Sequence, residues 1–198
     1  MNGRNTGQIR YKSVGSGRKV LLEQIKLILT LFLTGGILIA LETTVCSRIP
    51  LPMPVLGVCY ASPALGLLLS MAVGFLYGEE EGGITGLVAG WLSDAVSIGA
   101  SVGSMMVLPL LYFLCGYLSG AVGKRRLAHN LPSFMVFAVV GGGIKCLFTV
   151  GLAALELRSP PPILWVWRGL VPAWLLTILC SVAVYGIVYG ERKLLEPK

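Results

Sequence analysis

The chain has 198 residues, of which 55% are hydrophobic and only 13% are charged. A soluble domain carries about twice that share of charged residues, so the composition excludes an ordinary soluble protein and predicts a polytopic membrane protein. The net charge of +7 at pH 7 does not indicate nucleic-acid binding. The basic residues gather at the ends of apolar runs, as expected of a membrane protein with a fixed orientation.

The chain divides into a polar start, a long apolar centre and a short polar end. The start is basic and contains too few apolar residues to fold by burial. We therefore predict a basic disordered cytoplasmic tail over residues 1–22 and a six-helix transmembrane domain over residues 23–192. Residues 193–198 are predicted to form a cytoplasmic C-terminal tail.

The apolar runs predict an all-α protein with six transmembrane helices. In order, these are Ile25–Leu41, Pro63–Tyr77, Gly82–Ala100, Gly103–Val122, Leu131–Leu155 and Leu170–Tyr189. Prolines between the first two helices exclude a continuous helix there, so residues 47–62 are predicted to be re-entrant or interfacial. The acidic residues Glu79, Glu80 and Glu81 are assigned to a turn between the second and third helices.

Small residues recur at every fourth position along the second, third and fourth helices. The positions are Ser62, Gly66, Ser70, Gly74 and Gly78 on the second helix, Gly82, Gly86 and Gly90 on the third, and Gly116 and Gly120 on the fourth. Residues at this spacing share one helix face, and glycines on that face let two backbones approach closely. The pattern predicts a tightly packed antiparallel pair formed by the second and third helices.

Two charged residues, Asp94 and Lys145, fall deep inside the predicted helices. From the same side of the membrane, Asp94 lies roughly 16 Å and Lys145 roughly 21 Å along its helix at 1.5 Å per residue. A charge at such depth needs a partner or a function. We therefore predict a buried Asp94–Lys145 ion pair that braces the bundle. The alternative is a proton or ion path, which would call for more polar groups inside the membrane.

The distribution of Lys and Arg predicts the orientation. Most of them lie on the side of the two termini, whereas only Arg48, Arg158 and Arg168 lie on the opposite side. Because cytoplasmic loops carry the excess of basic residues, both termini are predicted to be cytoplasmic.

No residue pattern supports catalysis or metal binding. The run Gly116–Gly120 superficially resembles a serine-protease motif, but the only histidine, His129, lies in a predicted cytoplasmic loop. A serine nucleophile needs a base within hydrogen-bond reach. The five cysteines are scattered without a close pair, and the three adjacent acids diverge around a turn. We expect no enzyme activity, no cofactor and no metal.

The stretch from Ser62 to Arg125 resembles the MreD family of rod-shape-determining proteins. The matching features are Pro63 before a short helix, Gly90 and Asp94 in a Gly-x-x-x-Asp pattern, and the Gly116–Gly120 run before basic residues. Ala64 and the acidic turn depart from the usual family pattern. The resemblance implies a fold similar to the substrate-binding subunits of energy-coupling-factor transporters.

The resemblance also implies a function. MreD-like proteins are non-enzymatic scaffolds of the cell-elongation machinery in the bacterial cytoplasmic membrane, where they bind the scaffold protein MreC. The wider assembly contains MreB filaments, RodA and a class B penicillin-binding protein, and links the cytoskeleton to peptidoglycan synthesis. We therefore expect membrane lipid and an MreC-like protein as partners, and no nucleic acid. The alternative is a substrate-binding subunit of an energy-coupling-factor-type vitamin transporter.

Overall fold

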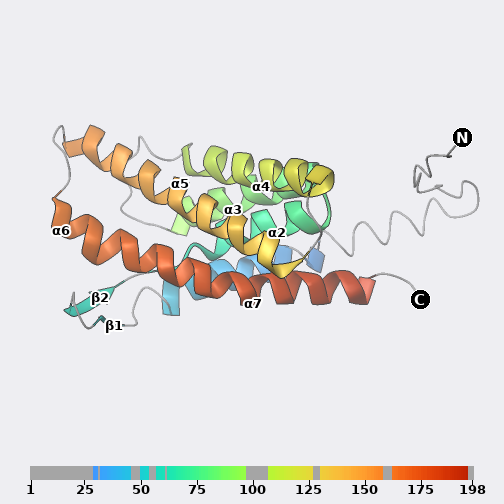
Figure 1. Cartoon of the computed structure of the whole chain (residues 1–198), viewed down its shortest axis with the longest axis horizontal. Helices are drawn as coiled ribbons and strands as arrows, with labels where there is room; N and C mark the ends of the chain where they lie inside the picture. Colours follow the sequence, from blue (N-terminus) through green and yellow to red (C-terminus); the bar gives the residue numbers. More distant parts are fainter. Residues whose placement is uncertain are drawn as a thin grey trace, which may run out of the picture.

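The computed structural model describes residues 29–30, 32–45, 50–53, 57–60, 62–96, 107–126, 130–157 and 162–195. The predicted tail at residues 1–22 lies outside this part of the chain. The described residues form an elongated bundle of helices with one short hairpin at its end (Figure 1). The all-α prediction is therefore correct for the bundle but misses the hairpin.

The elements follow the predicted order. An N-terminal helix (residues 29–30 and 32–40) continues as the π-helical turn η1 (Leu41–Val45) and is followed by strands β1 (Pro50–Met53) and β2 (Gly57–Tyr60). Helices α2 (Leu65–Leu76), α3 (Glu79–Val96), α4 (Val107–Arg126) and α5 (Leu131–Leu157) come next. The last helical stretch consists of α6 (Ile163–Trp165), the π-helical turn η3 (Val166–Leu170) and α7 (Val171–Leu195).

Helix α2 lies at the centre of the bundle. All 12 of its residues are buried, and it contacts α3, α4, α5 and α7. It rises only about 18 Å at 1.5 Å per residue, well short of the roughly 30 Å of a bilayer core. Other segments cap both of its ends: the Ala64 N–H donates to Thr177 Oγ1 (3.0 Å), and Arg192 donates to the Leu76 carbonyl (3.0 Å). Tertiary packing therefore fixes this short helix, because its own sequence supplies no side-chain cap.

The small-residue positions on α2, α3 and α4 mark sites where backbones touch. A Cβ atom added at Gly74, Gly82 or Gly116 would overlap backbone atoms of one of the other two glycines. Toward the other end of α3, a Cβ at Gly86 would overlap the Tyr112 carbonyl, and one at Gly90 would overlap Pro109. These three helices therefore form one tightly packed unit, and α4 belongs to it as fully as the predicted α2–α3 pair.

Two of the predicted small-residue positions have other roles. Ser62 precedes α2 and donates a hydrogen bond to the Glu42 carbonyl (3.0 Å). Gly78 follows α2 and has φ = 148°, which a residue with a side chain rarely adopts. The turn consists of Tyr77 and Gly78 alone, so the placement of the acidic residues in it is wrong. Glu79, Glu80 and Glu81 instead form the first turn of α3, where the helix dipole favours negative charge.

The proline-rich segment forms an antiparallel hairpin. Pro50 pairs with Tyr60 and Pro52 with Val58. These two prolines are two residues apart, so their missing N–H groups both fall on the open edge of the two-stranded sheet. Strand β2 contacts η3, and the hairpin lies at the same end of the bundle as α6 (Figure 1). The described part of the segment is therefore a hairpin at the end of the bundle, and its re-entrant or interfacial placement stays a prediction.

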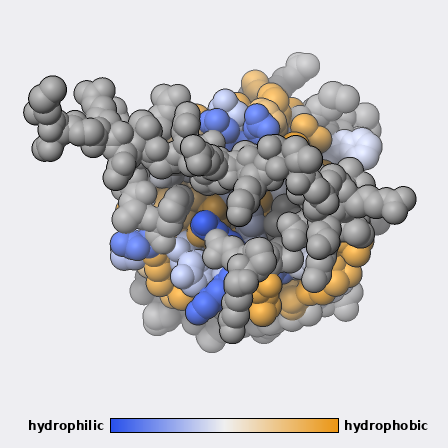
Figure 2. Space-filling view, turned by 90° about the vertical axis from the view of Figure 1, so that its right-hand side faces the viewer, coloured by the Kyte–Doolittle hydropathy of each residue, from blue (hydrophilic) through white to orange (hydrophobic). Residues whose placement is uncertain are grey.

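Two stretches, Leu131–Leu155 and Val166–Leu194, are long and apolar enough to cross a membrane. Helix α7 continues to Leu195, so the first three residues of the predicted C-terminal tail are helical. Its C-terminal end lies at the opposite end of the bundle from α6 (Figure 1). Seen from that end, hydrophilic residues lie on the end face and hydrophobic residues along its rim (Figure 2).

Candidate functional site

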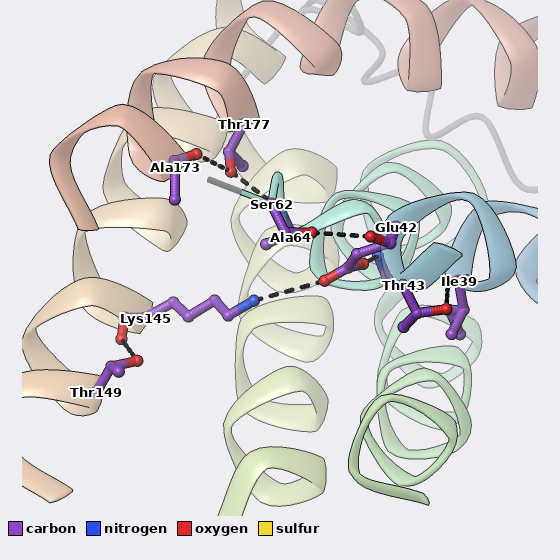
Figure 3. A network of polar contacts seen from close by, with 10 residues as sticks. Ile39, Glu42, Thr43, Ser62, Ala64, Lys145, Thr149, Ala173 and Thr177 are labelled. Atoms are coloured by element: carbon purple, nitrogen blue, oxygen red, sulfur yellow. Dashed lines mark hydrogen bonds and ion pairs between the residues drawn. The ribbon is translucent and has the colours of Figure 1, made fainter. Parts of the chain in front are cut away.

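Glu42 is the first member of a polar cluster inside the bundle. It lies in η1, is only 8% exposed, and its Oε2 accepts a hydrogen bond from the Gly66 N–H of α2 (3.1 Å). The carboxylate therefore caps the N-terminus of α2, where free N–H groups and the helix dipole favour an anion. The neighbouring Ser62 hydroxyl donates to the Glu42 carbonyl and holds this turn against the start of α2 (Figure 3).

Lys145 of α5 is the cationic partner of Glu42. Its Nζ lies 3.8 Å from Oε1 of Glu42 (Figure 3), and 5.5 Å from the centroid of the buried Tyr112 ring of α4. The ring face attracts the ammonium group, and the carboxylate balances its charge. The long lysine side chain thus joins α5 to η1 and α4.

The predicted Asp94–Lys145 ion pair is wrong. Counting from the observed helix starts puts Asp94 about 22.5 Å and Lys145 about 21 Å along their helices, so the depth of Asp94 was underestimated because α3 begins at Glu79. The pair does not form because the two helices have different neighbours. Helix α3 packs mainly against α2 and α4, whereas α5 packs mainly against α7 and α2. Lys145 consequently reaches Glu42, and no described residue donates a hydrogen bond to either carboxylate oxygen of the buried Asp94.

A cavity of about 180 Å³ opens beside Lys145. Three parts of the chain line it: Ser62 and Ala64 before α2, the face of α5 from Gly142 to Thr149, and Leu170 to Thr177 of η3 and α7. The Trp174 indole forms one wall and donates its N–H to the Val139 carbonyl (3.0 Å). A Cβ at Gly142 would lie 2.7 Å from this indole, so the ring can pack against α5 because residue 142 has no side chain.

The neutral polar groups of the cavity wall already donate to backbone carbonyls. Ser62 donates to Glu42, Thr149 to Lys145 and Thr177 to Ala173, and the Cys146 thiol lies 3.6 Å from the Leu170 carbonyl. The Lys145 ammonium has three N–H donors, and its carboxylate partner lies beyond ordinary hydrogen-bond distance at 3.8 Å. One of these donors serves the Tyr112 hydroxyl, so among the described wall residues Lys145 is the one with a further donor available to a ligand.

Sequence reasoning missed Glu42 as the partner of Lys145. The first predicted helix ends at Leu41, so Glu42 fell just beyond it and received no role. A usable signal was the start of α2. Its first N–H groups receive no side-chain cap from the residues before the helix, which are Ser62, Pro63 and Ala64. A short buried helix with an uncapped N-terminus requires a hydrogen-bond acceptor from elsewhere in the chain. Glu42 is an acid that lies shortly before the proline-rich segment leading to α2.

The superficial serine motif has a packing role in the structure. The Ser119 hydroxyl is 1% exposed and lies within hydrogen-bond distance of the Met71 (3.0 Å) and Gly116 (2.8 Å) carbonyls. It thereby joins α4 to α2. His129 lies outside the described residues. Within those residues, no group of three or more His, Cys, Asp or Glu side chains is placed to hold a metal ion.

Comparison with known proteins adds no relative: no protein-family model, curated protein or solved structure matches the chain.

Proposed function

We propose that the chain is a non-enzymatic integral membrane scaffold of the bacterial cell-elongation machinery, with an MreC-like protein as its direct partner. In this proposal it crosses the cytoplasmic membrane several times, has both termini in the cytoplasm, and links MreB filaments to peptidoglycan synthesis by RodA and a class B penicillin-binding protein. The resemblance of residues 62–125 to the MreD family suggests these partners. The packing of the same residues supports a scaffold.

The observation that carries the proposal is the division of α3 into two faces. Its glycine face packs against α2 and α4. The opposite face exposes large apolar side chains at helical spacing, namely Ile84, Leu87, Val88 and Trp91. We call these four residues the α3 stripe. A rigid helix with an outward apolar stripe is suited to receive a single transmembrane helix of a partner.

Charged groups inside the described bundle also favour a scaffold. Glu42 and Lys145 join η1, α2 and α5, and both are partly or wholly buried. A buried pair of this kind fixes how helices are arranged and does not itself perform a reaction. Asp94 lies three residues beyond Trp91 on α3, buried and without a described hydrogen-bond donor. Asp94 lies two residues before the end of α3, so a partner that supplies a donor at this end of the helix, apart from the stripe, would offset the cost of burying this carboxylate.

Co-purification from mild detergent with an MreC-like protein tests the proposal. Trp91 is 69% and Leu87 49% exposed, so replacing both by Ala removes apolar contact area without disturbing the glycine face. We expect recovery of the partner to fall at least about tenfold, the loss typical of an aromatic anchor in an interface. In a rod-forming host, the same variant is expected to give rounded cells.

The matched control replaces two equally exposed residues on another helix. Leu147 and Leu155 of α5 are 75% and 76% exposed, and their double Ala variant is expected to retain the partner. Equal recovery from both double variants would contradict the assignment of the α3 stripe. Asp94→Asn gives a second measurement: we expect reduced partner recovery with unchanged thermal stability of the isolated chain.

The cavity beside Lys145 favours a second candidate, a substrate-binding subunit of an energy-coupling-factor-type vitamin transporter. Ligand sites combine apolar and aromatic walls with a few polar groups, and Trp174, Leu170 and Lys145 provide that combination. A vitamin that co-purifies with the chain, together with association with coupling subunits and an unaltered cell shape on depletion, would select this function over the scaffold.

A further inference from the structure

We propose that the cavity beside Lys145 binds a small organic carboxylate whose body is about the size of one six-membered ring. The inference concerns the isolated chain and does not rest on the proposed scaffold function. Its failure would therefore leave the co-purification test untouched.

The charge of the ligand follows from the donors in the wall. The hydroxyls of Ser62, Thr149 and Thr177 donate to backbone carbonyls, so they present only oxygen lone pairs to the cavity. Among the described residues of the wall, Lys145 is the charged one, and a quarter of its side-chain surface remains exposed. A ligand that carries negative charge matches this ammonium group, whereas a positively charged ligand does not.

Glu42 leaves room for such an anion. It lies on the η1 side of Lys145 and is not part of the cavity wall (Figure 3). Its Oε2 is held by the Gly66 N–H, and Oε1 stays 3.8 Å from Nζ. The lysine can therefore keep its contact with Glu42 and direct another N–H toward a ligand in the cavity.

The size and body of the ligand follow from the volume and the apolar wall. A cavity of about 150 Å³ in a protein core is large enough for benzene, and this cavity measures about 180 Å³. The Trp174 indole, Leu170 and Ala173 provide apolar surface in the cavity wall. A single ring with one carboxylate would place its charge at Lys145 and its body against these residues.

The two π-helical turns in the described part of the chain both border this region. Glu42 belongs to η1, and Leu170 ends η3. A π-helical turn is rare and costs hydrogen-bond geometry, and such turns occur frequently at binding and catalytic sites. Here η1 places the Glu42 carboxylate beside Lys145, and η3 contributes Leu170 to the cavity wall.

Equilibrium dialysis of radiolabelled benzoate against the full chain in lipid nanodiscs tests the inference, with empty nanodiscs as the blank. We expect saturable binding of benzoate. Benzyl alcohol has the same ring and no charge, and we expect it to bind at least about tenfold more weakly, which corresponds to the loss of one charged hydrogen bond. Equal retention of the two compounds, or no saturable binding, would overturn the proposal.

Two Leu variants on the same helix locate the bound compound. Thr149→Leu places a larger side chain in the cavity and is expected to abolish benzoate binding. Gly151→Leu adds the same side chain two residues on, where nothing lies within 4 Å of the new Cβ, and is expected to bind as the natural chain does. If Thr149→Leu folds and binds benzoate undiminished, the compound lies elsewhere and the proposal fails.

The role of charge is tested without leaving Glu42 unpaired. The double variant Glu42→Gln with Lys145→Met removes both charges together, which avoids an isolated buried carboxylate. We expect it to lose the preference for benzoate over benzyl alcohol. A preference that persists in this folded double variant would show that Lys145 does not select the ligand.

Discussion

The two halves of the bundle are held together in different ways. In α2, α3 and α4, glycines bring backbones into direct contact. Around α5 and α7, side chains fill the contact instead, and the Trp174 indole, the Lys145 ammonium and a cavity lie between the helices. The first half is therefore a rigid unit with little spare volume, and the second contains the volume and the charge from which a ligand site can be made.

The difference also explains where the interior charges find partners. In the half that contains α5, the gap between helices lets the long Lys145 side chain reach Glu42. In the glycine-packed half, no described residue donates a hydrogen bond to Asp94. Close packing thus supplies rigidity, and looser packing supplies room for an ion pair.

The largest expected effect comes from breaking the glycine contacts. Gly82→Leu would place a side chain where the backbones of Gly74 and Gly116 already lie. We expect a loss of about 3 kcal/mol or more in the free energy of unfolding, or no folded protein at all, because overpacking cannot be relieved against backbone. Denaturant titration of the chain in mixed micelles measures it.

Gly186→Leu on α7 is the matched control for this prediction. Nothing lies within 4 Å of a Cβ at Gly186, and the residue is exposed. We expect its unfolding free energy to stay within about 0.5 kcal/mol of the natural chain, or to rise through the better helix propensity of Leu. Equal destabilisation by the two variants would remove the contrast between the halves.

A smaller effect is expected from the ion pair. Lys145→Met leaves Glu42 buried without its cation and should cost about 2 kcal/mol, less than the roughly 3–5 kcal/mol of a fully buried pair because Lys145 is partly exposed. Adding Glu42→Gln should recover part of this loss, giving a coupling energy of about 1 kcal/mol in a double-mutant cycle. The same cycle with Asp94→Asn should give a coupling near zero. A larger coupling of Lys145 to Asp94 than to Glu42 would restore the pair predicted from sequence.

The smallest expected effect is a gain in stability. Gly151 lies in α5, is exposed, and has nothing within 4 Å of an added Cβ. Gly151→Ala should raise the free energy of unfolding by about 0.5–1 kcal/mol, because Ala favours the helix over the unfolded chain. The same denaturant titration checks it. A loss of stability would mean that this face of α5 is covered in the folded protein.

The order and approximate limits of the helices could be predicted because they depend on local features of the chain. Apolar runs, prolines and glycines place Leu131–Leu157 and Val171–Leu195 close to their predicted positions. The start of α3 was misplaced because Glu79, Glu80 and Glu81 were read as turn residues, although acids also favour the first turn of a helix. The hairpin over Pro50–Tyr60 was missed because proline excludes a helix without specifying what replaces it.

The chain order alone shows which residues are small enough for backbones to touch and which charges lie deep among apolar residues. The spacing of small residues along single helices identifies the contact positions Gly74, Gly82 and Gly116. The depth of Lys145 in its apolar run identifies it as an interior charge. Which helices are neighbours depends on the packing of the whole chain. This packing placed Lys145 beside Glu42 because α5 adjoins the start of α2, and depth along a helix carries no information about lateral position. The same arrangement created the cavity, whose lining residues come from segments that are far apart in the chain.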